Sequence, residues 1–313
     1  MSRKVLLQLV LPLIGLSVLF WLLAFAPGDK HHQPALLEMS VILRDGDGNV
    51  SAMRKGMEQA AKDLNVELRF LTPAEDNSAV EQVQLLEHEV SGAAPAILLI
   101  PADREALGEA VSAAEGKTTL VTVESDMTAW GADASISMDH QALGEALGKA
   151  ALNGVPFGGT VLLDSLPGDN GVRERMEAAK ALLEEKGRQV RIYRWTSDST
   201  AFANILRIER PKAVIAFEAA ALTEMAELSR GEEAFPLLYG CGSTAGIAAA
   251  LEKGRVTAIA AVNVFSAGYL AVEAAAKLAR HESWTGASSV GFSIVRQETM
   301  YSSDNQKLLF PVT

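Results

Sequence analysis

After residue 35 the chain alternates between two kinds of hydrophobic pattern. Short, continuously apolar runs rich in β-branched residues predict strands that are buried on both faces. Most of these runs are separated by segments whose apolar residues recur every three to four positions, which predicts amphipathic helices. Strands that alternate with helices in this way indicate an α/β protein whose parallel sheets are covered by helices.

The predicted elements follow one another closely along the chain. We expect strands at Met39–Leu43, Val66–Leu71, Ala96–Ile100, Leu120–Val123, Ala134–Met138, Thr160–Leu163, Val190–Trp195, Ala213–Phe217, Pro236–Cys241 and Thr257–Val262. We expect helices at Ser51–Leu64, Ala79–Val90, Arg104–Glu115, Gln141–Leu152, Arg173–Glu185, Ala220–Leu228, Thr244–Glu252 and Ser266–Leu278.

The first thirty residues differ from the rest of the chain. Two basic residues precede an apolar run over residues 5–26, and these 22 residues would form a helix about 33 Å long, enough to cross a hydrocarbon core of about 30 Å. This pattern predicts an uncleaved signal anchor over residues 1–30 that places the remainder outside the cytoplasm. A cleaved secretory signal stays open as the alternative, because Ala24–Ala26 resembles a peptidase site, although Pro27 follows it.

Composition excludes several classes of protein. With 313 residues, 49% hydrophobic and 21% charged, the chain has enough apolar material for two lobes of middling size and is not globally disordered. Its net charge of −11 argues against a nucleic-acid partner, which would require a basic face. Cys241 is the single cysteine, and the five histidines show no metal-binding spacing, so we predict no disulfide, metal or cofactor.

The candidate binding residues follow the predicted strands, because parallel sheets bind ligands outside the carboxyl ends of their strands. Arginine forks and carboxylates hydrogen-bond vicinal hydroxyls, and aromatic faces pack on the apolar side of a sugar ring. Each such residue taken alone is better explained by helix capping or by solvation, so only their convergence at one sheet edge favours a site. The candidates are Arg44, Asp45, Asp47, Asn49, Glu124, Ser125, Asp126, Asn170, Arg173, Trp195, Phe217, Glu218, Gly242, Ser243 and Asn263.

Several segments, in this order, resemble motifs of one known family. They are Met53–Ala61 in the first helix, Leu99–Asp103 after the third strand, Gly171–Ala178, Ala213–Glu218 and Leu251–Ala258. Together they resemble the type 1 periplasmic solute-binding proteins, closest to the ribose-binding branch of ABC sugar transporter components. The resemblance covers about residues 36 to 298.

This resemblance implies two Rossmann-like lobes joined by three hinge crossovers. The first lobe would take residues 36–137 with 264–288, and the second 138–263 with 289–313. A ligand would lie in the cleft and be enclosed by hinge closure. By position, Arg173 matches the family's ligand-clamping arginine, residues 44–49 match its first binding loop, and Glu124 matches a carboxylate that grips sugar hydroxyls.

The sequence also departs from the family pattern. Ser125 replaces an arginine, Glu218 an asparagine, Gly242 an aspartate and Val262 a glutamine, and the paired aromatic residues of the first loop are absent. A polyol, an amine-bearing ligand or an empty cleft therefore remain alternatives to a sugar. Trp195 fits either a ring-stacking residue or a hydrophobic plug.

Other chemistries find less support. The turn Gly240–Gly246 matches a dinucleotide fingerprint, but no acidic residue ends the next strand to hold a ribose. Asp45–Asn49 resembles the start of a calcium loop, but Val50 occupies the position where that loop requires glycine, and no glutamate follows at the required offset. Ser165 and Ser243 lack a nucleophile elbow.

We therefore predict a non-enzymatic, extracytoplasmic, membrane-tethered protein that binds a small polar, sugar-like solute for an ABC permease. The alternative is a sensory module that signals to a membrane histidine kinase. A nucleotide-binding oxidoreductase is the remote alternative.

Overall fold

The computed structural model describes residues 35–45, 51–165, 169–196, 198–231 and 235–310. Residues Leu36–Thr313 form one compact unit, separate from Met1–Ala35. The predicted membrane anchor lies outside the described residues. Among the helices that the structure describes, none is both long and apolar enough to span a bilayer.

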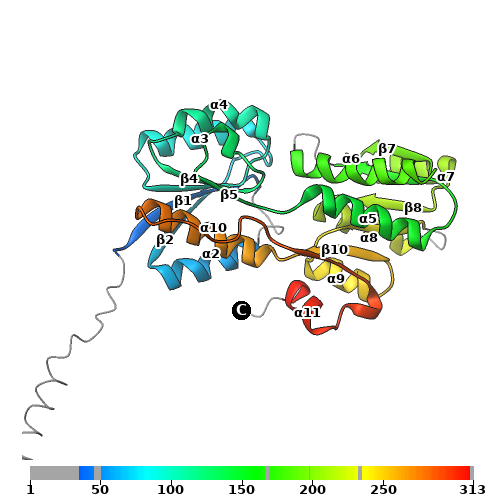
Figure 1. Cartoon of the computed structure of the whole chain (residues 1–313). Helices are drawn as coiled ribbons and strands as arrows, with labels where there is room; N and C mark the ends of the chain where they lie inside the picture. The colour runs from blue at the N-terminus through cyan, green and yellow to red at the C-terminus, as the bar shows by residue number, and fades with distance from the viewer. Residues whose placement is uncertain (1–34, 46–50, 166–168, 197, 232–234, 311–313) are drawn as a thin grey trace, which may run out of the picture. The chain divides into compact units, whose positions relative to one another are not determined.

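The first lobe contains a five-stranded, fully parallel sheet in the order β2-β1-β3-β4-β5. Its strands are β1 (Leu37–Ile42), β2 (Val66–Leu71), β3 (Ala96–Leu99), β4 (Thr119–Glu124) and β5 (Ala134–Ser137). Its helices are α2 (Ser51–Leu64), α3 (Ala79–Ser91), α4 (Arg104–Ala114) and α10 (Val264–Ala279). Helices α3 and α4 cover one face of the sheet, and α2 and α10 cover the other (Figure 1).

The second lobe contains a six-stranded sheet in the order β11-β10-β9-β8-β6-β7. Its strands are β6 (Thr160–Asp164), β7 (Val190–Arg194), β8 (Ala213–Ala216), β9 (Leu237–Cys241), β10 (Ala258–Val262) and β11 (Phe292–Val295). Its helices are α5 (His140–Gly154), α6 (Asn170–Glu185), α7 (Ser199–Glu209), α8 (Ala219–Leu228), α9 (Ala245–Glu252) and α11 (Ser303–Leu309). All pairs are parallel except β10 with β11.

The predicted α/β fold with parallel sheets and two lobes is confirmed. The central strands β3 and β8 are buried at every position, as their continuously apolar sequences predict. Helices α7 and α11 and the antiparallel strand β11 were not predicted.

Three segments lead from one sheet to the other (Figure 1). Residues 138–139 join β5 to α5, Asn263 joins β10 to α10, and residues 280–291 join α10 to β11. A parallel bridge between Ser137 and Ser289 places the first and third of these segments side by side. The carboxyl ends of both sheets therefore lie close to the crossings, where the candidate residues are found.

Glycines allow the helices that support these ends to pack closely. A Cβ on Gly268 of α10 would lie 2.1 Å from the Met53 carbonyl oxygen of α2, and one on Gly144 of α5 would lie 2.1 Å from the Arg175 carbonyl oxygen of α6. Any larger side chain would force each helix pair apart. The close contact between α5 and α6 fixes the backbone of Arg175, which belongs to the candidate site.

Candidate functional site

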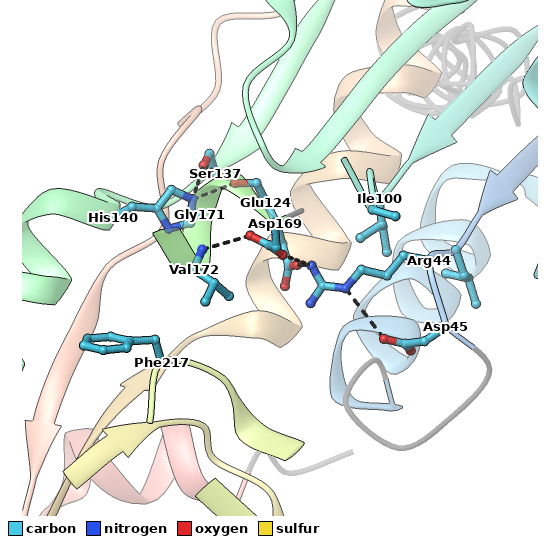
Figure 2. A network of polar contacts seen from close by, with 12 residues as sticks. Arg44, Asp45, Ile100, Glu124, Ser137, His140, Asp169, Gly171, Val172 and Phe217 are labelled. Carbon is cyan, nitrogen blue, oxygen red and sulfur yellow. Dashed lines mark hydrogen bonds and ion pairs between the residues drawn. The ribbon is translucent and has the colours of Figure 1, made fainter. Parts of the chain in front are cut away.

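Arg44 joins the two lobes. It follows β1 in the first lobe and is only 9% exposed. Its Nη1 atom lies 2.9 Å from Oε2 of Glu124, at the end of β4, and 2.5 Å from Oδ2 of Asp169. Asp169 caps the start of α6 in the second lobe, so its ion pair with Arg44 crosses between lobes. Figure 2 shows these three side chains pointing toward one another.

The electrostatics of this cluster keep Arg44 and Asp169 charged. Burial alone would lower the pKa of Arg44, but the neighbouring Glu124 and Asp169 carboxylates outweigh it and raise that pKa. Burial would raise the pKa of Asp169, but Arg44, Arg175 and the Val172 N–H together lower it. The cluster is therefore a charge-assisted network in which each ion is compensated.

Glu124 is held in a strained conformation. Its φ of +70° lies in the left-handed region, which is uncommon for a residue other than glycine and is enriched at functional sites. Its carbonyl oxygen accepts hydrogen bonds from Ser137 Oγ at 2.7 Å and from His140 Nε2 at 2.8 Å. Because a carbonyl only accepts, His140 carries its proton on Nε2. Burial and the nearby Arg175 lower the pKa of His140, which favours the neutral ring.

A cavity of about 270 Å³ lies between the lobes, beside Arg44. Residues of both lobes line it: Arg44, Ser51, Ala52, Lys55, Glu124, Met138, Arg175, Glu218, Ala219, Cys241, Gly242, Ser243, Thr244, Ala245, Val262, Val264 and Leu309. A cavity of this size suits one small molecule, and its mixture of charged, hydroxyl and apolar side chains suits a polar one.

Arg175 supplies a buried cation to the cavity wall. It is 7% exposed, its Nε donates to the Gly171 carbonyl at 2.9 Å, and its Nη1 donates to the Phe217 carbonyl at 2.8 Å. Two backbone carbonyls thus fix the guanidinium without neutralising it. Nearby, burial raises the pKa of the Cys241 thiol, so this thiol stays neutral.

Glu218 supplies a carboxylate to the cavity wall. It caps α8, where its Oε1 accepts the Ala221 N–H at 2.8 Å. Burial raises its pKa despite this cap and despite the nearby Arg44. The Glu218 carboxylate is therefore protonated more readily than the Asp169 carboxylate.

The structure brings five of the predicted residues together on the cavity wall: Arg44, Glu124, Glu218, Gly242 and Ser243. Asp45 lies beside them, with its carboxylate 3.6 Å from Arg44 Nε. Ser125 and Asn170 directly follow Glu124 and Asp169 in the sequence. Both are buried, but neither lines the cavity. Asp47 and Asn49 lie outside the described residues.

Arg173 does not line the cavity. It is exposed and hydrogen-bonds the Asn170 side chain in the first turn of α6. Arg175 lines the cavity instead, because residues two apart on a helix point to nearly opposite sides. The buried positions Val172, Met176 and Ala179 share the inner face of α6 with Arg175, and this periodicity is the signal that could have identified it.

Four other predicted residues have local structural roles. Trp195 donates from Nε1 to Glu224 at 2.6 Å and packs edge-on against Phe202, which matches the hydrophobic-plug reading. Phe217 is fully buried. Asp126 accepts the Thr128 N–H at 2.9 Å, and Asn263 caps α10. Asp169, Lys55 and Arg175 are the charged residues that the sequence reasoning missed.

The glycine-rich turn after β9 has a packing role that needs no cofactor. Gly242 has a φ of +134°, and a Cβ there would lie 2.9 Å from the Ala219 Cβ. Glycine therefore permits the tight turn into α9 and the close approach of α8. This turn forms the floor of the cavity through Cys241–Ala245.

The chain belongs to the family described as periplasmic binding protein domain, whose pattern matches residues 40–283. No curated protein matches the sequence significantly. Among solved structures, it is similar to a carbohydrate transporter solute-binding protein of Agrobacterium radiobacter in complex with D-arabinose, with a TM-score of 0.82 and 17% identity over 88% of this chain and 99% of that one. It is also similar to an ABC transporter solute-binding protein of Agrobacterium vitis with bound D-fucose, with a TM-score of 0.80 and 19% identity over 87% of this chain and 100% of that one. A chain from the XylFII–LytSN complex has a TM-score of 0.77 and 16% identity over 85% of this chain and 99% of that one. At these identities the likeness shows the fold, which is that of the type 1 periplasmic binding proteins.

Proposed function

We propose that the chain is an extracytoplasmic solute-binding protein that captures a small polar, sugar-like solute between its two lobes. The observation that carries this proposal is the cavity beside Arg44, which both lobes line with charged and hydroxyl side chains. The sugars bound in the similar structures, D-arabinose, D-fucose and α-D-tagatopyranose, support the ligand class.

The cavity residues would divide the work of binding. Arg175, fixed by two carbonyls, would donate to hydroxyl or carbonyl oxygens of the solute, and Glu124 and Glu218 would accept from its hydroxyls. Because these groups come from different lobes, a solute that contacts all of them favours the closed arrangement over an open one. The lobes would be residues 36–137 with 264–288 and residues 138–263 with 289–313.

We further propose that residues 1–30 anchor the protein in the cytoplasmic membrane and that it delivers its solute to an ABC importer. The apolar run over residues 5–26 supports the anchor. The transporter components among the similar structures support the importer.

A sensory role is the second candidate, and the similar chain from the XylFII–LytSN complex favours it, because that chain was solved together with a protein partner. Affinity capture of the full chain from its own membranes separates the two roles. Recovery of permease subunits would support transport, and recovery of a histidine kinase would support sensing.

A thermal-shift screen of the full-length chain, purified in mild detergent, tests solute binding. It should cover sugars, polyols, amino acids and polyamines. A solute that binds the folded state at a hundred times its Kd adds about 2.7 kcal/mol to the free energy of unfolding, so the melting temperature rises. The enantiomer of each active sugar serves as the control and should produce no shift. Flat responses across every class would contradict the proposed function.

A further inference from the structure

The charged groups on the cavity wall are unequally compensated. Among the described residues that line it, three are cationic, Arg44, Lys55 and Arg175, and two are carboxylates, Glu124 and Glu218. Which of these charges already has a partner decides what the cavity can still bind.

Both carboxylates have their partners within the protein. Glu124 lies 2.9 Å from Arg44 Nη1, and Glu218 accepts the Ala221 N–H at the start of α8, where the helix dipole favours negative charge. Neither carboxylate therefore requires a cation from the solute.

Two of the cations, Arg175 and Lys55, form no direct ion pair among the described residues. Arg175 donates to two neutral carbonyls and has no direct ion pair, although the Asp169 and Glu218 carboxylates are near enough to interact with its charge. Lys55, which is exposed, forms no ion pair within the part of the chain that the structure describes. Arg44 adds an unused donor, because its Nε is buried without a hydrogen-bond partner and lies 3.6 Å from Asp45 Oδ2. Arg175 is buried without a direct ion pair, and an anion placed between Arg175 and Lys55 would give both cations a direct partner.

The turn into α9 strengthens the preference for an anion. Ser243, Thr244 and Ala245 line the cavity at the N-terminus of α9 (Ala245–Glu252), where backbone N–H groups and the helix dipole attract negative charge. The cavity volume of about 270 Å³ limits the ligand to the size of a monosaccharide. Glu124 and Glu218 on the same wall oppose a dianionic phosphate more strongly than a monoanionic carboxylate.

We infer that the cavity selects a sugar acid, a monosaccharide that carries one carboxylate, over the corresponding neutral sugar. Arg175 and Lys55 bind the carboxylate, and Glu124 and Glu218 accept hydrogen bonds from the hydroxyls. This inference rests on the proposed function and names the solute class of the same site.

Calorimetric titration of the full-length chain in mild detergent tests it with matched probes. D-fucose and D-galacturonate differ only at C6, which is a methyl group in the first and a carboxylate in the second. D-glucose and D-glucuronate form a second pair, and D-glucose 6-phosphate serves as the dianionic probe. We expect the acid of at least one pair to bind about tenfold tighter than its neutral partner, because only the acid brings an anionic acceptor opposite the cationic donors of Arg175 and Lys55.

Lys55→Gln and Lys62→Gln supply the variant and its control, since both lysines are exposed on α2 but only Lys55 lines the cavity. Lys55→Gln should weaken binding of the acid about tenfold and change binding of the neutral sugar less than about twofold. Lys62→Gln should change neither.

The remaining outcomes distinguish failure of the sugar-acid inference from failure of the proposed function. Neutral sugars that bind as tightly as the acids, or D-glucose 6-phosphate binding tightest, would overturn the sugar-acid inference and leave solute binding intact. Equal losses in Lys55→Gln for the acid and its neutral partner would also overturn it. No binding of any of these probes would contradict the inference and the sugar-like class of the proposed function together.

Discussion

Asp169 has two roles at one position. Its Oδ1 accepts the Val172 N–H at 2.9 Å and caps α6, and its Oδ2 pairs with Arg44 across the lobes. Asparagine is an equally good helix cap but carries no charge, so Asp169→Asn isolates the ion pair. We expect this variant to lose about 2 kcal/mol of unfolding free energy near neutral pH, because Arg44 keeps only part of its compensation.

The pH dependence of stability gives a second readout of the same pair. The pKa of Asp169 is lowered in the folded state, so its contribution to stability is fully present above the unfolded value of 3.8 and is lost as the pH falls through the folded pKa. Urea unfolding measured between about pH 3 and about pH 7 should therefore show that the free energy of unfolding falls less with acidification in Asp169→Asn than in the parent.

Asp139→Asn is the matched control, because Asp139 caps α5 through the Ala142 N–H at 2.8 Å and forms no ion pair among the described residues. Its curve should run parallel to that of the parent. Parallel curves for both variants would show that the Arg44–Asp169 pair does not stabilise the fold.

At the scale of the elements, α2 and α10 depend on the absence of a side chain at Gly268. A methyl group there would meet the Met53 carbonyl oxygen at 2.1 Å. Gly268→Ala should lower the free energy of unfolding by about 1–3 kcal/mol, because backbone atoms cannot move aside cheaply. Gly246→Ala is the control, since a Cβ on this exposed residue of α9 would meet no heavy atom closer than 4.0 Å.

Chemical denaturation of both glycine variants checks this prediction. Gly246→Ala should be neutral or more stable by up to about 1 kcal/mol, because alanine is the better helix former. Equal stability of the two variants would mean that α2 and α10 do not require the close contact.

Most elements were predictable because their buried faces are regular. The bounds of α2 and β2 agree with the sequence pattern at both ends. Helix α7 was missed because its apolar pattern is blurred: Phe202 is fully buried, but Ile208 on the same helix is 70% exposed. Strand β11 has four residues, and its antiparallel pairing with β10 is set by contacts distant in the sequence.

The site was predictable at the strand ends but less so on the helices. Arg44, Glu124 and Glu218 follow parallel strands, so the general rule for such sheets places them at the cleft. Lys55 and Arg175 lie on helices, where their direction depends on how each helix is rotated against its sheet. Motif resemblance favoured Arg173, and only the rotation of α6 decides between the two arginines.

At the scale of the whole binding unit, several polar contacts bridge the lobes beside the cavity. They include Arg44 with Asp169, Arg104 Nη1 with Glu174 at 3.6 Å, and His140 with the Glu124 carbonyl at 2.8 Å. The outer pair between Arg104 and Glu174 is partly exposed and contributes little, whereas the pair between Arg44 and Asp169 is buried and links the lobes in the arrangement that the structure shows. A solute can favour this arrangement only through contacts that an open cleft does not offer.

The central claim is that the cavity beside Arg44 is the solute site, and calorimetric titration of a cavity-filling variant tests it most directly. Ser243→Trp places a large side chain into a cavity of about 270 Å³, and Ser91→Trp places the same side chain on the exposed end of α3 as the control. With the tightest-binding solute of the screen, we predict that Ser243→Trp loses binding while the parent and Ser91→Trp bind equally. Undiminished binding by a folded Ser243→Trp variant would contradict the account.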